Sequence, residues 1–212
     1  IANHLVKLGW HVSLLTPSWV TSIATKKLDE TVANIALADV SEADIEKALA
    51  STQFRSVISL SPKTKVEGIT FESDHKKGLQ LAFLLAKLTK LNQPVLAKNS
   101  NDARSSFVVL TRQGGDFATN KIEKKVDLVQ AGLSGLVKTL SHEWENVFCR
   151  IVDIPSSYAA NKVENIVISE LNDKQTTPVE VGFNKDGRLT LVAKATDSYA
   201  LENGNSITQD SV

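Results

Sequence analysis

Short apolar runs rich in β-branched residues alternate along the chain with longer segments whose apolar positions recur every three or four residues. The short runs predict buried strands and the longer segments predict helices, because strands and helices repeat with these two periods. We expect strands at 11–16, 32–40, 55–61, 105–112 and 148–154, and helices at 1–9, 42–50, 75–91, 122–145 and 161–172. Apolar strands separated by helices predict a doubly wound α/β fold, in which helices cover both faces of a parallel sheet.

Local signals indicate where several of these elements begin and end. Gly9 is a good stop for the first helix, since glycine readily leaves the helical conformation. Ser41 is suited to cap the helix that follows it, with Asp44 three residues later in a pattern like a capping box. Pro155 ends the strand at 148–154.

The C-terminal part of the chain predicts a hairpin followed by a linker. Residues 178–183 and 188–193 are extended apolar segments on either side of NKDG, which contains an Asp-Gly turn signal. The remaining residues, 196–212, are polar and are expected to form a linker-like tail. We therefore expect one domain over residues 1–195.

The two longest expected helices, 75–91 and 122–145, are more apolar than a single buried stripe requires. The second also carries a strip of small residues, Ala131, Gly132 and Gly135. A glycine inside a helix costs about 1 kcal/mol relative to alanine, which indicates that something approaches the backbone closely. We expect one helix face to pack on the sheet and the other on a helix pair of a second domain or chain. The alternative is that loops of the same domain cover it.

Composition and charge narrow the classes of partner. Lys plus Arg and Asp plus Glu are both 24, so the neutral chain offers no general attraction for nucleic acid or acidic membranes. Apolar content of 42% and charged content of 23% are typical of a globular protein, and no apolar run reaches membrane-spanning length. The single cysteine, Cys149, favours a reducing compartment and is predicted to be a packed strand residue.

Motifs for catalysis are mostly absent from the sequence. The four histidines show no metal-ligand spacing, and His142-Glu143 lacks the second histidine of a zinc-protease helix because Asn146 occupies that position. Asp153 and Glu143 are isolated carboxylates that make no convincing acid/base pair. Gly114-Gly115 predicts a turn at the carboxyl end of a strand, where a ligand-binding role stays open.

The order of the elements resembles the short-chain dehydrogenase/reductase superfamily over residues 1–155. IANHLVKLGWHVSLL is similar to the first helix and second strand, and ADVSEADIEKAL to the third strand and the helix after it. SVISLS, FVVLTR and CRIVDIP stand where the fourth, fifth and sixth strands would be. The resemblance implies a truncated Rossmann-like fold whose first strand and dinucleotide loop would precede Ile1.

The family's catalytic residues are replaced in this chain. AGLSGL at 131–136 matches the family pattern, but Val126 stands at the tyrosine position and Gln130 at the lysine position. In active members a phenol, with its pKa lowered by a neighbouring ammonium, passes a proton to the carbonyl oxygen. Valine and glutamine supply neither group, and Thr111 is the nearest hydroxyl to the usual serine. We expect no catalytic residue and no metal site, and we leave the cofactor-binding residues undefined.

A narrower resemblance involves GLSGLVKTLSHEWENVFCRIVDI followed by PVEVGFNKDGRLTLV. These segments are similar to the structural subdomain of ketoreductase domains in modular polyketide synthases and polyunsaturated fatty acid synthases. The resemblance implies a non-catalytic half that binds no cofactor, next to a catalytic half that uses NADPH to reduce β-ketoacyl chains on a carrier protein. It also implies a cytoplasmic, multidomain and homodimeric parent synthase.

On this interpretation the long helices pair with those of the catalytic subdomain, as helices do in dimeric relatives. The residues expected at that interface are Leu81, Leu85, Leu88, Leu133, Leu136, Val137 and Leu140. Two other interpretations stay open. One is an active NADPH-dependent short-chain reductase of acyl-carrier-bound ketones, and the other is a flavodoxin-like module that binds a partner or a nucleotide.

Overall fold

The computed structural model describes residues 1–20, 27–50, 55–61, 73–92, 104–119 and 127–195, and of 73–75 and 89–92 it describes the backbone alone. The expected tail at 196–212 and Val126 at the family's tyrosine position lie outside these ranges.

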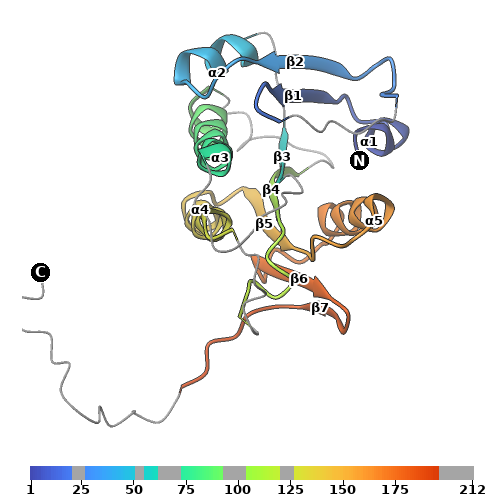
Figure 1. Ribbon diagram of the computed structural model, residues 1–212, viewed down its shortest axis with the longest axis vertical. Helices are drawn as coiled ribbons and strands as arrows, with labels where there is room; N and C mark the ends of the chain where they lie inside the picture. Colours follow the sequence, from blue (N-terminus) through green and yellow to red (C-terminus); the bar gives the residue numbers. More distant parts are fainter. Residues whose placement is uncertain (21–26, 51–54, 62–72, 93–103, 120–126, 196–212) are drawn as a thin grey trace, which may run out of the picture.

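The chain folds as an α/β domain in which strands form a central layer between two layers of helices (Figure 1). One sheet has the strand order β3 (Ser56–Leu60), β4 (Ser105–Thr111), β5 (Val147–Asp153), β6 (Glu180–Asn184) and β7 (Gly187–Leu189). Its first four strands are parallel, and β7 pairs antiparallel with β6. The predicted fold, a truncated Rossmann-like parallel sheet with helices on both faces, is confirmed.

Strands β1 (Ser13–Pro17) and β2 (Ala33–Leu37) pair with each other in parallel and form a separate two-stranded sheet. Within the described residues β1 is not hydrogen-bonded to β3 as a neighbouring strand. The strand and dinucleotide loop expected before Ile1 stay a prediction.

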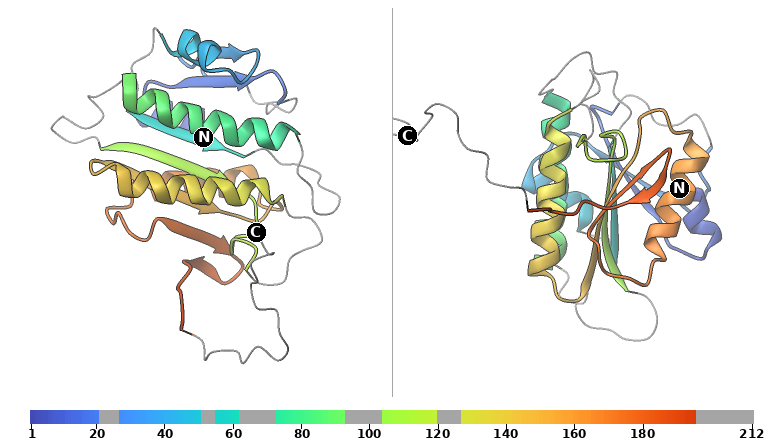
Figure 2. Two further views of the ribbon diagram at one scale, coloured as in Figure 1. Left: turned by 90° about the vertical axis from the view of Figure 1, so that its left-hand side faces the viewer. Right: turned by 90° about the horizontal axis from the view of Figure 1, so that it is seen from below.

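The helices are divided between the two faces. Helices α1 (Ala2–Lys7) and α5 (Ala160–Leu171) lie on one side of the strands, and α2 (Glu42–Leu49), α3 (Ser73–Asn92) and α4 (Val129–Glu143) lie on the other (Figures 1 and 2). Helix α3 runs next to α4, so the two longest helices form a pair on the same face.

Several predicted element ends are confirmed by hydrogen bonds. The amide of Gly9 donates to the carbonyl of Val6 at 2.9 Å, and the φ of Gly9 is 85°, which ends α1. The amide of Asp44 donates to Oγ of Ser41 at 3.1 Å, while the Ser41 hydroxyl donates to the Asp44 carboxylate at 2.6 Å. The hairpin around NKDG forms as β6 and β7.

The predicted helix at 122–145 is wrong at its described N-terminal end. Helix α4 begins at Val129, and Asp127 and Leu128 precede it. The amide of Val129 donates to Oδ1 of Asp127 at 3.0 Å. Aspartate before a helix favours this local bond over helical continuation, because its carboxylate accepts a free amide of the first turn.

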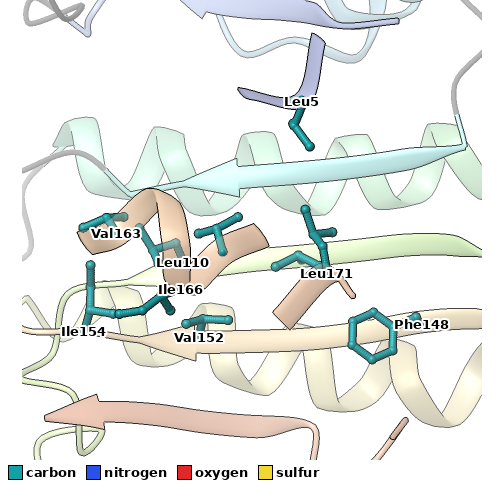
Figure 3. Close-up of a cluster of buried hydrophobic side chains, with 10 residues drawn as sticks. Leu5, Leu110, Phe148, Val152, Ile154, Val163, Ile166 and Leu171 are labelled. Carbon is teal, nitrogen blue, oxygen red and sulfur yellow. The ribbon is translucent and has the colours of Figure 1, made fainter. Parts of the chain in front are cut away.

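The core has one layer on each face of the sheet. Strand β4 is buried over its whole length, with Val108 and Leu110 on the α5 side and Phe107 and Val109 on the α3–α4 side. Figure 3 shows the first layer, where side chains of α5 pack on β4 and β5 and Leu5 of α1 joins them. Burial on both faces explains why the centre of β4, from Phe107 to Leu110, is continuously apolar rather than alternating.

Candidate functional site

The carboxyl ends of β3, β4 and β5 meet at one edge of the sheet, because the three strands are parallel. Folds of this class place ligands at this edge. It is also where the resemblance would place catalytic groups. Thr111 and Asp153 are register partners at the ends of β4 and β5, and the segment that follows β4 folds back over them.

Asp153 is the centre of this edge. Its side chain is 0% exposed. Oδ1 accepts the Thr111 hydroxyl and the Gln113 amide, both at 2.7 Å. Oδ2 accepts the amides of Gly115 at 2.7 Å and Phe117 at 2.9 Å. Burial raises the pKa of Asp153 above its ordinary value, and the four hydrogen bonds act in the opposite direction.

The segment after β4 has an unusual backbone. Gly114 and Gly115 have φ values of 97° and 86°, and Phe117 and Ala118 have φ values of 58° and 55°. This is the left-handed region, which glycine adopts easily and which costs other residues about 1–2 kcal/mol each. The predicted turn at Gly114-Gly115 is confirmed, and its amides point at a carboxylate of the same chain.

Gly115 also contacts the neighbouring strand β6. A Cβ atom on Gly115 would lie 2.1 Å from the carbonyl oxygen of Phe183, and one on Gly182 would lie 2.2 Å from the carbonyl oxygen of Gly115. Real Cβ atoms do not approach backbone atoms so closely. The turn after β4 therefore packs against β6 through two glycines.

Gln130, which the resemblance to the short-chain dehydrogenases would align with their lysine, is buried and forms a hydrogen bond at the same edge of the sheet. Its Oε1 accepts the amide of Arg112 at 2.7 Å. The Arg112 side chain in turn donates from Nε to the carbonyl of Ser61, just after β3, at 3.1 Å. Burial lowers the pKa of the Arg112 guanidinium from its ordinary value. The Gln130 side chain is therefore committed to a backbone amide of the segment that follows β4.

The chemistry available at this edge is limited. The hydroxyl of Thr111, which the resemblance would place nearest to the usual serine, donates its hydrogen bond to Asp153. In the described ranges no group of three or more His, Cys, Asp or Glu side chains is placed to hold a metal ion. Cys149 lies in β5 as a buried residue, and burial raises the pKa of its thiol to about 12, so it is not a nucleophile at neutral pH.

Sequence reasoning missed Asp153. The sequence suggests an isolated carboxylate, whereas the structure gives it four donors, three of them backbone amides. Backbone amides carry no residue-specific signal. The available signal was the pair of glycines that follows a strand of the same sheet.

The second candidate region is the outer face of α3 and α4. Of the residues expected at an interface, Leu81 and Leu136 are half-buried, and the others are buried within the domain itself: Leu85, Leu88, Leu133, Val137 and Leu140. These five side chains pack in the core beneath the helices, and the outward positions belong to other residues of the same helices.

The outward positions form an open hollow between the two helices. Its volume is about 370 Å³, and it is lined by Leu79, Phe83 and Leu136 with Lys76 and Gln80. Phe83 is 53% exposed. The interface prediction omitted Leu79 and Phe83, although they lie four residues apart on α3 and therefore on one helix face.

The two glycines of α4 differ in what surrounds them. A Cβ on Gly132 would lie 3.0 Å from Cδ2 of Leu79, so Gly132 lets α3 approach α4. A Cβ on Gly135 would meet nothing within 4 Å. Contacts inside the domain therefore account for Gly132 and leave Gly135 facing open space.

Comparison with known proteins adds no family to this description: no family model matches the chain, and no curated protein matches it either. None of the helices in the described part of the chain combines the length and apolar character needed to cross a bilayer.

Proposed function

We propose that this chain is a non-catalytic structural subdomain that stabilises and positions the NADPH-dependent β-ketoacyl reductase half of a multidomain synthase. The observation that carries the proposal is the position of Gln130. Its carboxamide binds the backbone of Arg112 where the family's lysine would lower the pKa of a catalytic phenol. A neutral side chain committed to a backbone amide cannot do that work.

The α3–α4 face supports the other half of the proposal, that the chain has a helical partner. Phe83, Leu79 and Leu136 line an open hollow, and Gly135 leaves room next to it. Burying an apolar side chain of this size stabilises a contact by about 1.5–3 kcal/mol. We assign this face to the helices of the catalytic ketoreductase subdomain of the same chain.

The remaining features of the proposal rest on the resemblance. The fragment binds no cofactor, and NADPH belongs to the catalytic half, which reduces acyl chains carried by a carrier protein. The parent is a cytoplasmic homodimer that makes polyketides or polyunsaturated fatty acids. Neither nucleic acid nor a membrane is a partner.

Introduction of a negative charge on the apolar face of α3 and α4 tests the proposal. Phe83→Asp and Leu136→Asp, each introduced into the parent synthase, should lower NADPH-dependent reduction of a β-ketoacyl thioester at least roughly tenfold, because a charge would be buried in an apolar contact. Leu8→Asp is the matched control, since Leu8 is 51% exposed and follows α1 on the opposite side of the sheet. If Leu136→Asp leaves activity and stability intact, the proposed contact is wrong.

Titration with NADPH separates this proposal from the active-reductase alternative. We expect no micromolar binding to the chain of 212 residues, measured by calorimetry or by quenching of tryptophan fluorescence. Binding in the micromolar range would favour the enzyme interpretation and would contradict the structural role.

A further inference from the structure

The carboxylate of Asp153 is bound in the way that a protein binds a foreign anion. A carboxylate offers about four acceptor positions. Here each oxygen accepts two donors, with the three amides contributed by alternate residues, Gln113, Gly115 and Phe117. Backbone amides of one short turn that converge on one anion form the kind of concave site found at phosphate and carboxylate ligands, although here the donors are alternate rather than successive residues.

A second observation concerns the same segment. Phe117 and Ala118 hold left-handed backbone conformations that residues with a Cβ rarely adopt. Such conformations persist only when surrounding contacts impose them. The contacts that impose them include the bond from Phe117 to Asp153 and the bond from the Ala118 amide to the Gln113 carbonyl, at 3.0 Å.

We infer that residues 113–117 form an anion-binding turn whose ligand is the chain's own Asp153, and that this internal carboxylate keeps the ligand-binding edge of β4 and β5 closed. The inference is independent of the proposed function, since it concerns only how this edge is occupied. The turn takes a small carboxylate, and formate or acetate is the free counterpart of the side-chain group.

Hydrogen exchange on the unaltered chain gives the first test. The amides of Gln113, Gly115 and Phe117 share one acceptor group and should therefore exchange through one common opening, with equal protection factors. Their protection should exceed that of the Asp186 amide roughly tenfold or more, because Asp186 donates to the exposed side chain of Asn184. Three unrelated protection factors, or protection no greater than that of Asp186, would overturn the inference.

Substitution of the internal ligand gives the second test. Asp153→Asn keeps the shape of the side chain, but its carboxamide NH₂ is itself a donor and cannot accept the amides that bound the lost oxygen. Exchange of the three amides should therefore accelerate roughly ten- to a hundredfold. Exchange in the middle of β4, at Val108 and Val109, should stay unchanged. Thr111→Val is the milder variant, since it removes one donor and leaves the carboxylate and its three amides.

Chemical rescue separates a binding site from a residue that is merely buried. Asp153→Ala leaves room for a free carboxylate, and sodium formate should raise its melting temperature by roughly 2 °C or more above the same concentration of sodium chloride. The unaltered chain should respond equally to both salts. Equal responses in the alanine variant, or uniform loss of protection across β4 and β5 in the asparagine variant, would show that Asp153 supports the core rather than an anion turn.

Discussion

Two regions of this domain use glycine in opposite ways. At the carboxyl edge of the sheet, Gly115 and Gly182 face each other so closely that a Cβ atom on either would lie 2.1–2.2 Å from a carbonyl oxygen. On the outer face of α4, Gly135 has room for a side chain and meets nothing within 4 Å. The first region is filled by the chain itself, and the second is open.

The difference indicates which region has its contacts satisfied within the chain. At the carboxyl edge, Asp153, Gln130 and Arg112 bind backbone groups of the same chain, so the place where this fold usually holds a ligand has internal partners. At the helix face, no residue that the structure describes lies within 4 Å of a Cβ built on Gly135, where glycine costs about 1 kcal/mol relative to alanine. We therefore expect an external partner at α4 and none at the edge.

The largest expected effect comes from filling the tight contact. Gly182→Ala should lower the free energy of unfolding by about 3 kcal/mol or more, because the new Cβ would meet the backbone of Gly115, which has little freedom to move. Chemical denaturation of the isolated chain measures this loss. A change below about 1 kcal/mol would mean that the turn is free to shift, and the edge would no longer count as tightly filled.

Much of the fold could be predicted because it depends on patterns within single segments. Apolar runs located β3, β4 and β5, and the Ser41–Asp44 cap was visible from side chains three residues apart. The closed edge could not be predicted in the same way. Asp153 binds amides up to 40 residues away, and an amide has the same identity in every residue except proline.

The candidate interface shows a second limit. The sequence identified the apolar helices correctly, but it could not say which side of each faces outward. Leu88 and Val137 pack into the core, whereas Phe83 is exposed. Among the described side chains of α3, the exposed stripe consists of Lys76, Gln80, Phe83 and Lys87. An apolar residue within a short polar stripe gives only a weak indication of the solvent side.

A smaller effect is expected at the ion cluster that joins α5 to β5 and β7. Glu170 is buried and accepts Arg188 of β7 at 2.8 and 3.2 Å, and Arg150, which is 0% exposed, lies 3.6 Å from it. Glu170→Gln should cost about 2 kcal/mol, because two guanidinium groups lose their buried carboxylate and keep, within the described residues, only Asp173 as a charged partner. The loss should loosen β6 and β7 without changing the α3–α4 face.

The ion pair of Glu180 with Lys138, at 3.1 Å, is more open to solvent and provides the control for this change, since the two side chains are 17% and 49% exposed. Glu180→Gln should change the free energy of unfolding by less than about 1 kcal/mol, because half of the Lys138 side chain is in contact with water. Urea denaturation of both variants measures the contrast. Equal losses in the free energy of unfolding would show that burial of Glu170 does not strengthen its ion pairs.

The opposite sign is expected at the open glycine. Gly135→Ala should stabilise the isolated chain by up to about 1 kcal/mol, because alanine favours the helix and its methyl group meets no neighbour. If the proposed function holds, the same methyl group should weaken the proposed contact at α4 in the full synthase. Thermal unfolding of the isolated chain and β-ketoacyl reductase activity of the full protein measure the two effects.

Gly132→Ala is the matched control on the same helix. Its Cβ would lie 3.0 Å from the Leu79 side chain, so the helix gain should be partly or wholly offset by crowding between α3 and α4. If Gly132→Ala stabilises the chain as much as Gly135→Ala does, the two positions are equivalent. The special status of Gly135 would then be lost.

The smallest expected effect is a pH dependence of the ion cluster that follows α5, at the amino ends of β4 and β6. Asp173 accepts the amide of Gln175 at 3.0 Å and pairs with Arg188 at 3.0 Å and Arg150 at 3.3 Å. The hydrogen bond from the Gln175 amide contributes most, and the nearby arginines contribute further, to a pKa of Asp173 that lies below its ordinary value of 3.8. A carboxyl group with a lowered folded-state pKa stabilises the fold above its unfolded value and loses that contribution as the pH falls.

Comparison of the unaltered chain with Asp173→Asn isolates this contribution. The difference in free energy of unfolding should be constant above about pH 5 and should shrink between about pH 4 and pH 2, because acid then neutralises the carboxylate in the unaltered chain as well. Asp186→Asn, in the turn between β6 and β7, controls for the general effect of acid on surface charge. A difference that grows as the pH falls would contradict the assigned direction.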